Sequence, residues 1–157
     1  MKLFTLCYVE KDDHYLMLHR NKKENDVHQG KWVGLGGKFE PGESPEECVV
    51  REVLEESGLH IKNPQLRGIL TFPGSFKKED GYVFVFTARE FTGELIACPE
   101  GELAWVKKRS IKDLPMHEAD HVFIDWMNQH PGIFSGKFNY ENGVCTSHHM
   151  IGYGEGF

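Results

Sequence analysis

The stretch that decides the fold is GKFEPGESPEECVVREVLEESGL, residues 37–59, in which a glycine-rich loop runs directly into a helix. Ser44 precedes Pro45 and is followed three residues later by Glu47, an order typical of a helix that begins with a capping box and a proline in its first turn. Gly58 suits the left-handed conformation in which many helices end. The sequence therefore predicts a helix from Pro45 to about Ser57.

Three glutamates lie on one side of this predicted helix. Glu52, Glu55 and Glu56 are spaced i, i+3 and i+4, so that at about 100° per residue they fall within one sector of about 100°. Like charges at this spacing repel each other, and the C-terminal half of a helix disfavours anions. The opposite side, expected against the core, holds Val50, Val53, Leu54 and Ser57.

Hard carboxylate oxygens are the ligands that Mg²⁺ and Mn²⁺ prefer, so the three glutamates predict a divalent metal site. A solvated helix face is the alternative for the glutamates taken alone. The glycine-rich loop favours the metal site, because it can bring the Gly36 carbonyl and the Lys38 ammonium to the same place.

The remainder of the chain indicates an α+β fold. Short β-branched or aromatic runs predict strands, a proline-closed segment predicts a helical turn, and Asn142-Gly143 predicts a two-residue hairpin. An amphipathic pattern ending before Pro131 predicts a second helix. The strands are expected at 3–9, 15–20, 66–72, 81–90 and 102–106, the turn at 111–115 and the helix at 118–130.

Length and charge restrict the class of protein. A chain of 157 residues with 39% hydrophobic residues suits one soluble domain, 1–157. Its 18 basic and 24 acidic residues give a net charge of −6, which disfavours general binding to nucleic acid or membrane surfaces. The sequence lacks a long apolar run, a secretory leader and paired C-x-x-C spacing, and we expect reduced cysteines in the cytoplasm.

The loop and helix together resemble a known motif. Gly37, Glu43 and the run REVLEESGL at 51–59 match the Nudix box, Gx5Ex7REUxEExGU with U aliphatic, at every specified position. The resemblance implies an α/β/α sandwich around a mixed β-sheet, with the box at 37–59 forming a loop-helix-loop. It also implies hydrolysis of nucleoside diphosphates linked to another moiety, with Mg²⁺ or Mn²⁺.

The same resemblance implies roles for particular residues. The glutamates of the cluster, Glu52, Glu55 and Glu56, would bind metal together with the Gly36 carbonyl, and Glu52 would also be the general base. Arg51 and Glu43 would pair to hold the loop against the helix, and Lys38 would neutralise a phosphate.

The flanking sequence is similar to the MutT-type branch, particularly the oxidised-purine nucleoside triphosphatases. This implies a further acidic metal ligand, Glu100 or Glu102, of which the spacing to Trp105 favours Glu100. It implies a base pocket with Thr5 on its strand, Asp120 reading the purine edge, and Gly37 and Val33 beside the substrate. Val33 departs from the branch, because the human enzyme has Asn there to bind the base.

The expected activity is therefore a Mg²⁺-dependent 8-oxo-dGTP diphosphatase that releases the monophosphate and pyrophosphate, in a protein that is a monomer or a homodimer. An undamaged dNTP, a pterin triphosphate, a dinucleotide or a capped RNA end is the alternative substrate. A nucleotide sensor without hydrolysis is the alternative function, against which the complete set of box residues argues.

Overall fold

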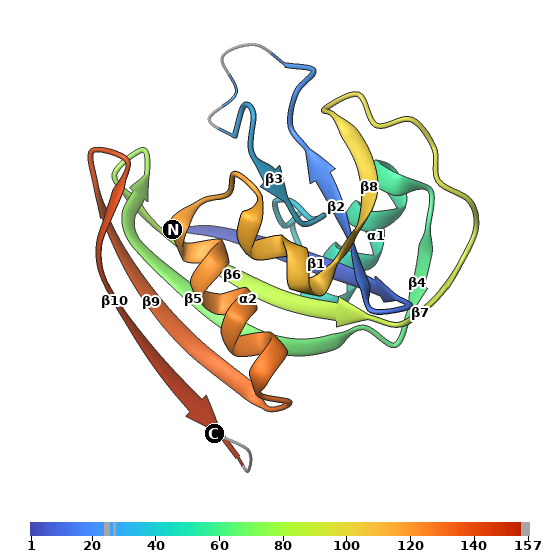
Figure 1. Ribbon diagram of the computed structural model, residues 1–157. Helices are drawn as coiled ribbons and strands as arrows, with labels where there is room; N and C mark the ends of the chain where they lie inside the picture. The colour runs from blue at the N-terminus through green and yellow to red at the C-terminus, as the bar shows by residue number, and fades with distance from the viewer. Residues whose placement is uncertain (24–25, 27, 155–157) are drawn as a thin grey trace.

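A central mixed sheet with one α-helix against each face forms the framework of the protein (Figure 1). The computed structural model describes residues 1–23, 26 and 28–154. The strands are β1 (Lys2–Lys11), β2 (His14–His19), β3 (Trp32–Val33), β4 (His60–Lys62), β5 (Gln65–Phe76), β6 (Glu79–Ala88), β7 (Glu90–Thr92), β8 (Glu102–Lys107), β9 (Ile133–Glu141) and β10 (Val144–Tyr153). The helices are α1 (Pro45–Ser57), a short 3₁₀ helix (Lys108–Asp113) and α2 (Glu118–Gln129).

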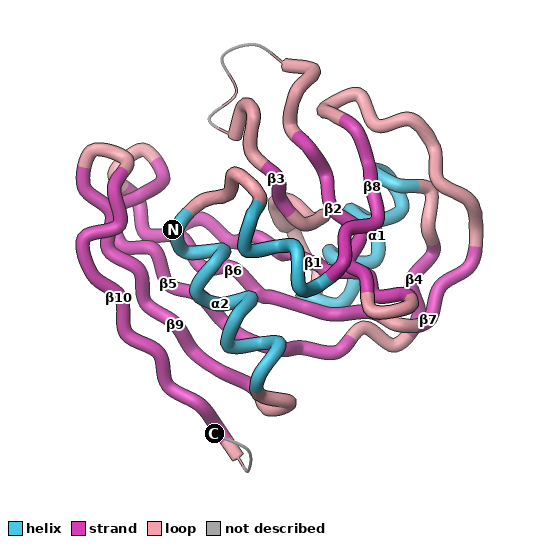
Figure 2. Tube along the Cα trace, in the orientation of Figure 1, coloured by secondary structure: helices cyan, strands magenta, loops and turns pink. Residues whose placement is uncertain are grey.

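The main sheet has the strand order β10-β9-β5-β6-β1-β2-β3, and β8 also pairs with β2 (Figure 2). The β1–β6 and β5–β9 pairs are parallel and the other pairs are antiparallel, so the sheet is mixed. Strands β4 and β7 form a separate pair beside α1. Consecutive residues Cys7, Tyr8 and Val9 are all fully buried, so the later part of the stretch 3–9 is covered on both faces, whereas Leu3, Phe4 and Leu6 are half-buried.

Two apolar clusters lie on the two faces of the sheet. The first packs α1, through Val49 and Val53, against side chains of β1, β2 and β6. The second packs α2, through Phe123 and Ile124, against the other face of β1 and β6 and against β5 and β9. These layers confirm the predicted α/β/α arrangement.

Helix α1 begins and ends where the sequence predicts. The Ser44 hydroxyl accepts a bond from the Glu47 amide at 3.1 Å, and the Glu47 carboxylate accepts one from the Ser44 amide at 3.0 Å. Gly58 ends the helix in the left-handed region with φ of 81°. The expectation that Leu54 packs in the core is wrong: the buried side of the helix runs through Val49, Val53 and Ser57, and Leu54 is 46% exposed.

Other boundaries differ from the sequence prediction for a structural reason. The predicted strand 81–90 is divided, because the chain leaves β6 at Ala88 and the residues of β7 pair with β4 instead. The hairpin at Asn142-Gly143 forms, with φ of 51° and 79° at these two residues. Among the described residues, no helix is long and apolar enough to span a membrane.

Candidate active site

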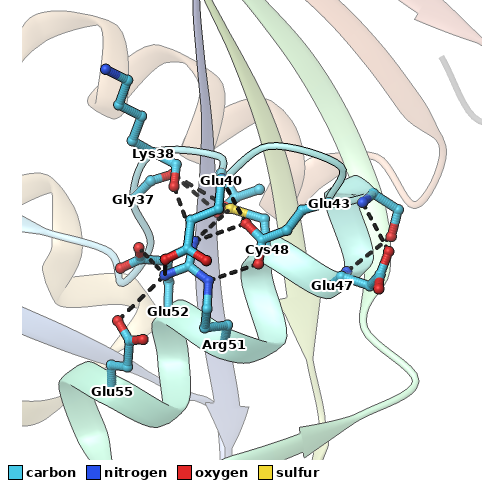
Figure 3. Close-up of polar contacts among 11 residues, drawn as sticks. Gly37, Lys38, Glu40, Glu43, Glu47, Cys48, Arg51, Glu52 and Glu55 are labelled. Carbon is cyan, nitrogen blue, oxygen red and sulfur yellow. Dashed lines mark hydrogen bonds and ion pairs between the residues drawn. The ribbon is translucent and has the colours of Figure 1, made fainter.

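Arg51 on α1 joins the glycine-rich loop to the helix (Figure 3). Its Nε and Nη2 atoms donate to the two oxygens of Glu43, at 2.7 and 2.9 Å, and Nη2 also donates to the Lys38 carbonyl at 3.1 Å. The bidentate bond lowers the pKa of Glu43 to about 2. The Arg51 guanidinium, which forms two bonds to Glu43, therefore holds the loop against α1, as the family resemblance implies.

Glu52 lies between this arginine and the backbone of the loop. Its Oε1 accepts a bond from Arg51 Nη1 at 2.7 Å. A β-carbon on Gly37 would come within 2.5 Å of the Glu52 carboxyl carbon, and one on Gly36, where φ is 148°, would collide with the Thr5 carbonyl. The two glycines thus let the loop pass between β1 and the glutamate.

Glu56 faces the same loop one turn further along α1. The Gly36 amide donates to its Oε1 at 2.7 Å. Burial, followed by the charges of Glu100 and Glu52, raises the pKa of Glu56 to about 8. Burial also raises the pKa of Glu52, against the opposing bond from Arg51. For Glu52 and Glu56, burial therefore outweighs the partners that favour the charged form.

Glu100 joins this group from the loop before β8. Its oxygens pair with Arg20 at 3.1 Å and with Lys23 at 3.4 Å, and its charge raises the pKa of both Glu52 and Glu56. Glu102 is an exposed residue of β8 with no such effect on these two groups. The geometry thus favours Glu100 over Glu102 as a member of the cluster.

The donor atoms suit a hard divalent cation. The charges of Glu55 and Glu100 act on Glu52, those of Glu100 and Glu52 act on Glu56, and the Gly36 carbonyl accepts no hydrogen bond from the described residues. No group of three or more acidic, histidine or cysteine side chains, among the residues that the structure places, is arranged ready to hold a metal. Arg51 contacts both Glu52 and Glu55, at 2.7 and 3.4 Å (Figure 3).

A cavity of about 640 Å³ adjoins the cluster at Gly36 and Gly37. Its apolar wall includes Leu70, Phe72 and Phe76, and its polar wall includes Thr5, Lys31 and Asp120. Thr5, Val33, Gly37 and Asp120, the expected substrate residues, all line it. Burial raises the pKa of Asp120 to about 7, so this carboxyl is largely able to donate as well as accept a hydrogen bond near neutrality.

Some residues behave differently from the sequence prediction. Lys38, expected near the phosphates, is exposed and its side chain extends away from the glutamates in Figure 3. Arg20 is a residue that the sequence did not reveal: it lines the cavity and pairs with Glu100 and Asp26. Arg20 and Glu100 are 80 positions apart, and the sequence contains no local signal that joins them.

Two histidines with no predicted role also line the cavity. The ring nitrogens of His28 and His117 are 2.6 Å apart, and burial lowers the pKa of both, to about 4 for His117. Only one of the two nitrogens can carry the shared hydrogen, and burial with the nearby charge of Lys31 disfavours protonation of both rings. The pair adds hydrogen-bonding nitrogens to the lining of the cavity.

A family model described as the NUDIX domain matches residues 4–127. The chain belongs to the Nudix family. It is 36% identical over 140 residues to the uncharacterized Nudix hydrolase YvcI of Bacillus subtilis, covering 87% of this chain and 85% of that protein.

Two other relatives align with almost the whole length of this chain. It is 31% identical over 150 residues to an oxidized purine nucleoside triphosphate hydrolase of Danio rerio, covering 96% of this chain and 94% of the other. The crystal structure of a mutator MutT protein from Bacillus halodurans has a TM-score of 0.85 and 32% identity, with 96% and 97% of the two chains covered. The protein is a MutT-type Nudix hydrolase, an enzyme of phosphoanhydride bonds.

Proposed function

We propose that this enzyme is a Mg²⁺-dependent nucleoside triphosphate pyrophosphohydrolase, with 8-oxo-dGTP as its substrate in sanitation of the nucleotide pool. The observation that carries the proposal is the continuity of the cavity with the carboxylate cluster at Gly36 and Gly37. A base in the cavity puts its phosphates beside the glutamates. The name of the Danio rerio relative supports an oxidised purine as the base.

Glu52 is the proposed general base. It would remove a proton from the water that attacks the β-phosphorus, and the products are the nucleoside monophosphate and pyrophosphate. The burial that raises the pKa of Glu52 moves it toward the pH of the reaction, where a base is most effective. Arg51 fixes the carboxylate in place through its bond at 2.7 Å.

The proposed metal ligands are the Gly36 carbonyl and the carboxylates of Glu52, Glu55, Glu56 and Glu100. A bound Mg²⁺, with Mn²⁺ as a substitute, supplies charge neutralisation for the phosphates and makes a bound water more acidic. Lys38 is the proposed mobile cation for a phosphate, which requires its exposed side chain to turn toward the bound nucleotide.

The proposed base-binding residues are Thr5, Val33, Gly37 and Asp120. Asp120 is the discriminating group, because a carboxyl with a pKa of about 7 binds a purine edge either as donor or as acceptor. Val33 offers only an apolar contact, so polar recognition of the base falls to the other lining residues. We place the enzyme in the cytoplasm, with which the four free cysteines agree.

Rates of pyrophosphate release from 8-oxo-dGTP and dGTP, compared at equal concentration, test the substrate. The proposal requires 8-oxo-dGTP to have the higher kcat/KM. Equal kcat/KM values for the two nucleotides would contradict a role specific to damaged nucleotides but would still agree with a nucleoside triphosphate hydrolase. Parallel tests with a pterin triphosphate, a dinucleotide and capped RNA identify the substrate in that case.

Reaction in ¹⁸O-labelled water tests the bond that is cleaved. Attack at the β-phosphorus puts the label in pyrophosphate, whereas label in the monophosphate contradicts the assignment. Glu52→Gln should lower kcat by about 10²–10⁴-fold, the usual contribution of a positioned base. Glu46→Gln, a change of the same type at an exposed position of α1, is the control and should retain the wild-type rate.

A further inference from the structure

A second cavity, of about 1130 Å³, lies at the other end of α2 from the nucleotide cavity. Its lining comes from the end of β1, the start of β2, the start of β5, the 3₁₀ helix and α2 from His121 onward. The described residues that line it are all different from those of the nucleotide cavity. On β1, Glu10 lines the second cavity and Thr5 the first, which puts them about 17 Å apart along an extended strand.

Basic side chains dominate the wall of this second cavity. Three acidic residues, Glu10, Asp13 and Asp125, face five cations, which are Arg67, Arg89, Lys108, Arg109 and Lys112. This excess of positive charge occurs in a chain whose net charge is −6. A cavity whose charge opposes that of the whole chain concentrates anions locally.

Glu10 arranges two of the cations and neutralises only one charge. Arg89 Nε and Lys108 Nζ each donate to a different oxygen of this buried carboxylate, at 2.7 Å. The Arg89 side chain is 77% exposed, and among the described residues its two Nη groups have no acceptor. Glu10 therefore holds Arg89 and Lys108 at the cavity wall, and the two Nη groups of Arg89 remain available as hydrogen-bond donors.

Arg67 is a further cation that lines the second cavity. Its Nη2 donates to the carbonyls of Met127 and His130 at the end of α2, at 2.9 and 2.6 Å. Its Nε is buried without a hydrogen-bond partner, and no carboxylate of the described residues forms an ion pair with it. The negative charge of Glu10 acts on Arg67 without forming an ion pair and is already shared between Arg89 and Lys108, so an anion in the cavity would offset part of the cost of burying this guanidinium.

We propose that this second cavity binds a small phosphorylated anion at a site separate from the catalytic one. Phosphate suits the arrangement because arginine donors match its oxygens in pairs. Tyr15 and Trp126 line the same space, and the Lys108 ammonium lies 4.9 Å from the Tyr15 ring centre. The ligand is either a pyrophosphate, held by the cations alone, or a nucleoside monophosphate, which adds a base against the half-buried Trp126 ring, since Tyr15 is fully buried.

Titration of the ¹⁵N-labelled full chain in EDTA, followed by amide shifts, tests the proposal with sodium pyrophosphate in one arm and dGMP in the other. We expect saturable shifts at residues 67, 89, 108–112 and 124–130. A larger affinity for dGMP assigns the ring contact, and a larger affinity for pyrophosphate assigns the cations alone. No saturable binding of either, or shifts confined to residues 4–6 and 33–37, would overturn the proposal.

A triple variant provides the second readout. Arg89→Gln, Arg109→Gln and Lys112→Gln together should weaken binding at least about tenfold, because each lost bond between charged partners is individually worth that much. Lys62→Gln, Lys77→Gln and Lys137→Gln remove the same charge from positions outside both cavities and should leave binding unchanged. Equal weakening in both triple variants would mean attraction by overall charge and would contradict a site. The titration involves no turnover, so its result is independent of the proposed hydrolysis.

Discussion

At the scale of single residues, the absence of a side chain at Gly37 leaves the room that the Glu52 carboxylate occupies. The loop backbone passes so close to the carboxylate that a β-carbon at Gly37 would lie 2.5 Å from the Glu52 carboxyl carbon. The glycine is needed there for room, since its φ is not in the left-handed region. The position of the proposed base thus depends on an absent side chain.

Gly37→Ala should displace Glu52 and lower kcat by at least about tenfold, because a misplacement of about 1 Å in a catalytic group has large effects. Gly42→Ala is the control. At Gly42 φ is 81° and a β-carbon meets nothing within 4 Å, so this variant should lose about 1 kcal/mol of stability and keep its activity. Kinetics together with urea denaturation measures both effects. Full activity in Gly37→Ala would contradict the argument.

Asp120 gives the protein a pH-dependent stability. Burial raises its pKa to about 7, above the value of about 3.9 in an unfolded chain. Between these values the unfolded chain loses the proton first, so the folded state binds more protons and its stability falls as pH rises. Below about pH 4 and above about pH 8 the contribution of Asp120 is constant.

Asp120→Asn should remove this dependence. The unfolding free energy of the variant, relative to wild type, is expected to increase steadily between pH 4 and pH 7 and then to level off. Urea denaturation of both proteins at four pH values in this range measures the difference. Parallel curves for the two proteins would show that Asp120 has an ordinary pKa.

At the scale of elements, α1 is the part of the chain that local sequence determines most completely. Its capping box, its proline and its C-terminal glycine are all short-range signals, and they place both ends correctly. The Arg51–Glu43 pair follows from the same run of residues. By contrast, β3, β4 and β7 contain two or three residues each, too few to show a period.

Ser44→Ala should lower the unfolding free energy by about 1 kcal/mol, because it removes the acceptor of the Glu47 amide bond. Ser44→Thr keeps the hydroxyl and should be close to wild type. Urea denaturation measures the change, and kcat should stay within about twofold because the cap lies two turns from Glu52. Equal loss in the two variants would show that the hydroxyl is not what matters.

The candidate site was predictable only in part. Glu52, Glu55 and Glu56 share a helix face by simple periodicity, and the box motif relates them to Gly36 and Gly37. The contacts of Glu100 with Arg20, and of His28 with His117, join parts of the chain 80 or more residues apart. Such contacts depend on sheet order, which a single sequence does not specify. The outward side chain of Lys38 depends on rotamers, which periodicity cannot give.

At the scale of the whole molecule, the net charge of −6 opposes an anionic substrate. Removal of divalent ions with EDTA should therefore abolish hydrolysis, and added Mg²⁺ or Mn²⁺ should restore it. Without nucleotide, Mg²⁺ should also raise the thermal midpoint of wild type more than that of Glu56→Gln, since binding to the folded state stabilises it.

Sodium chloride at the same ionic strength is the control for the metal experiment. It should neither restore the rate nor raise the midpoint, because screening alone does not supply a ligand-bound charge. A hydrolysis rate that persists in EDTA would contradict a metal-dependent reaction. An equal midpoint shift in Glu56→Gln would remove Glu56 from the ligands.

Arg51 has one more consequence for how the enzyme cycles. A guanidinium keeps its proton throughout the physiological range, so Arg51 is a permanent cation among the acidic side chains that are the proposed metal ligands. Because its two bonds to Glu43 tie the loop down independently of any ion, departure of product and metal leaves the loop backbone in place. Successive turnovers can begin from the same geometry, with side-chain rotation as the only preparation.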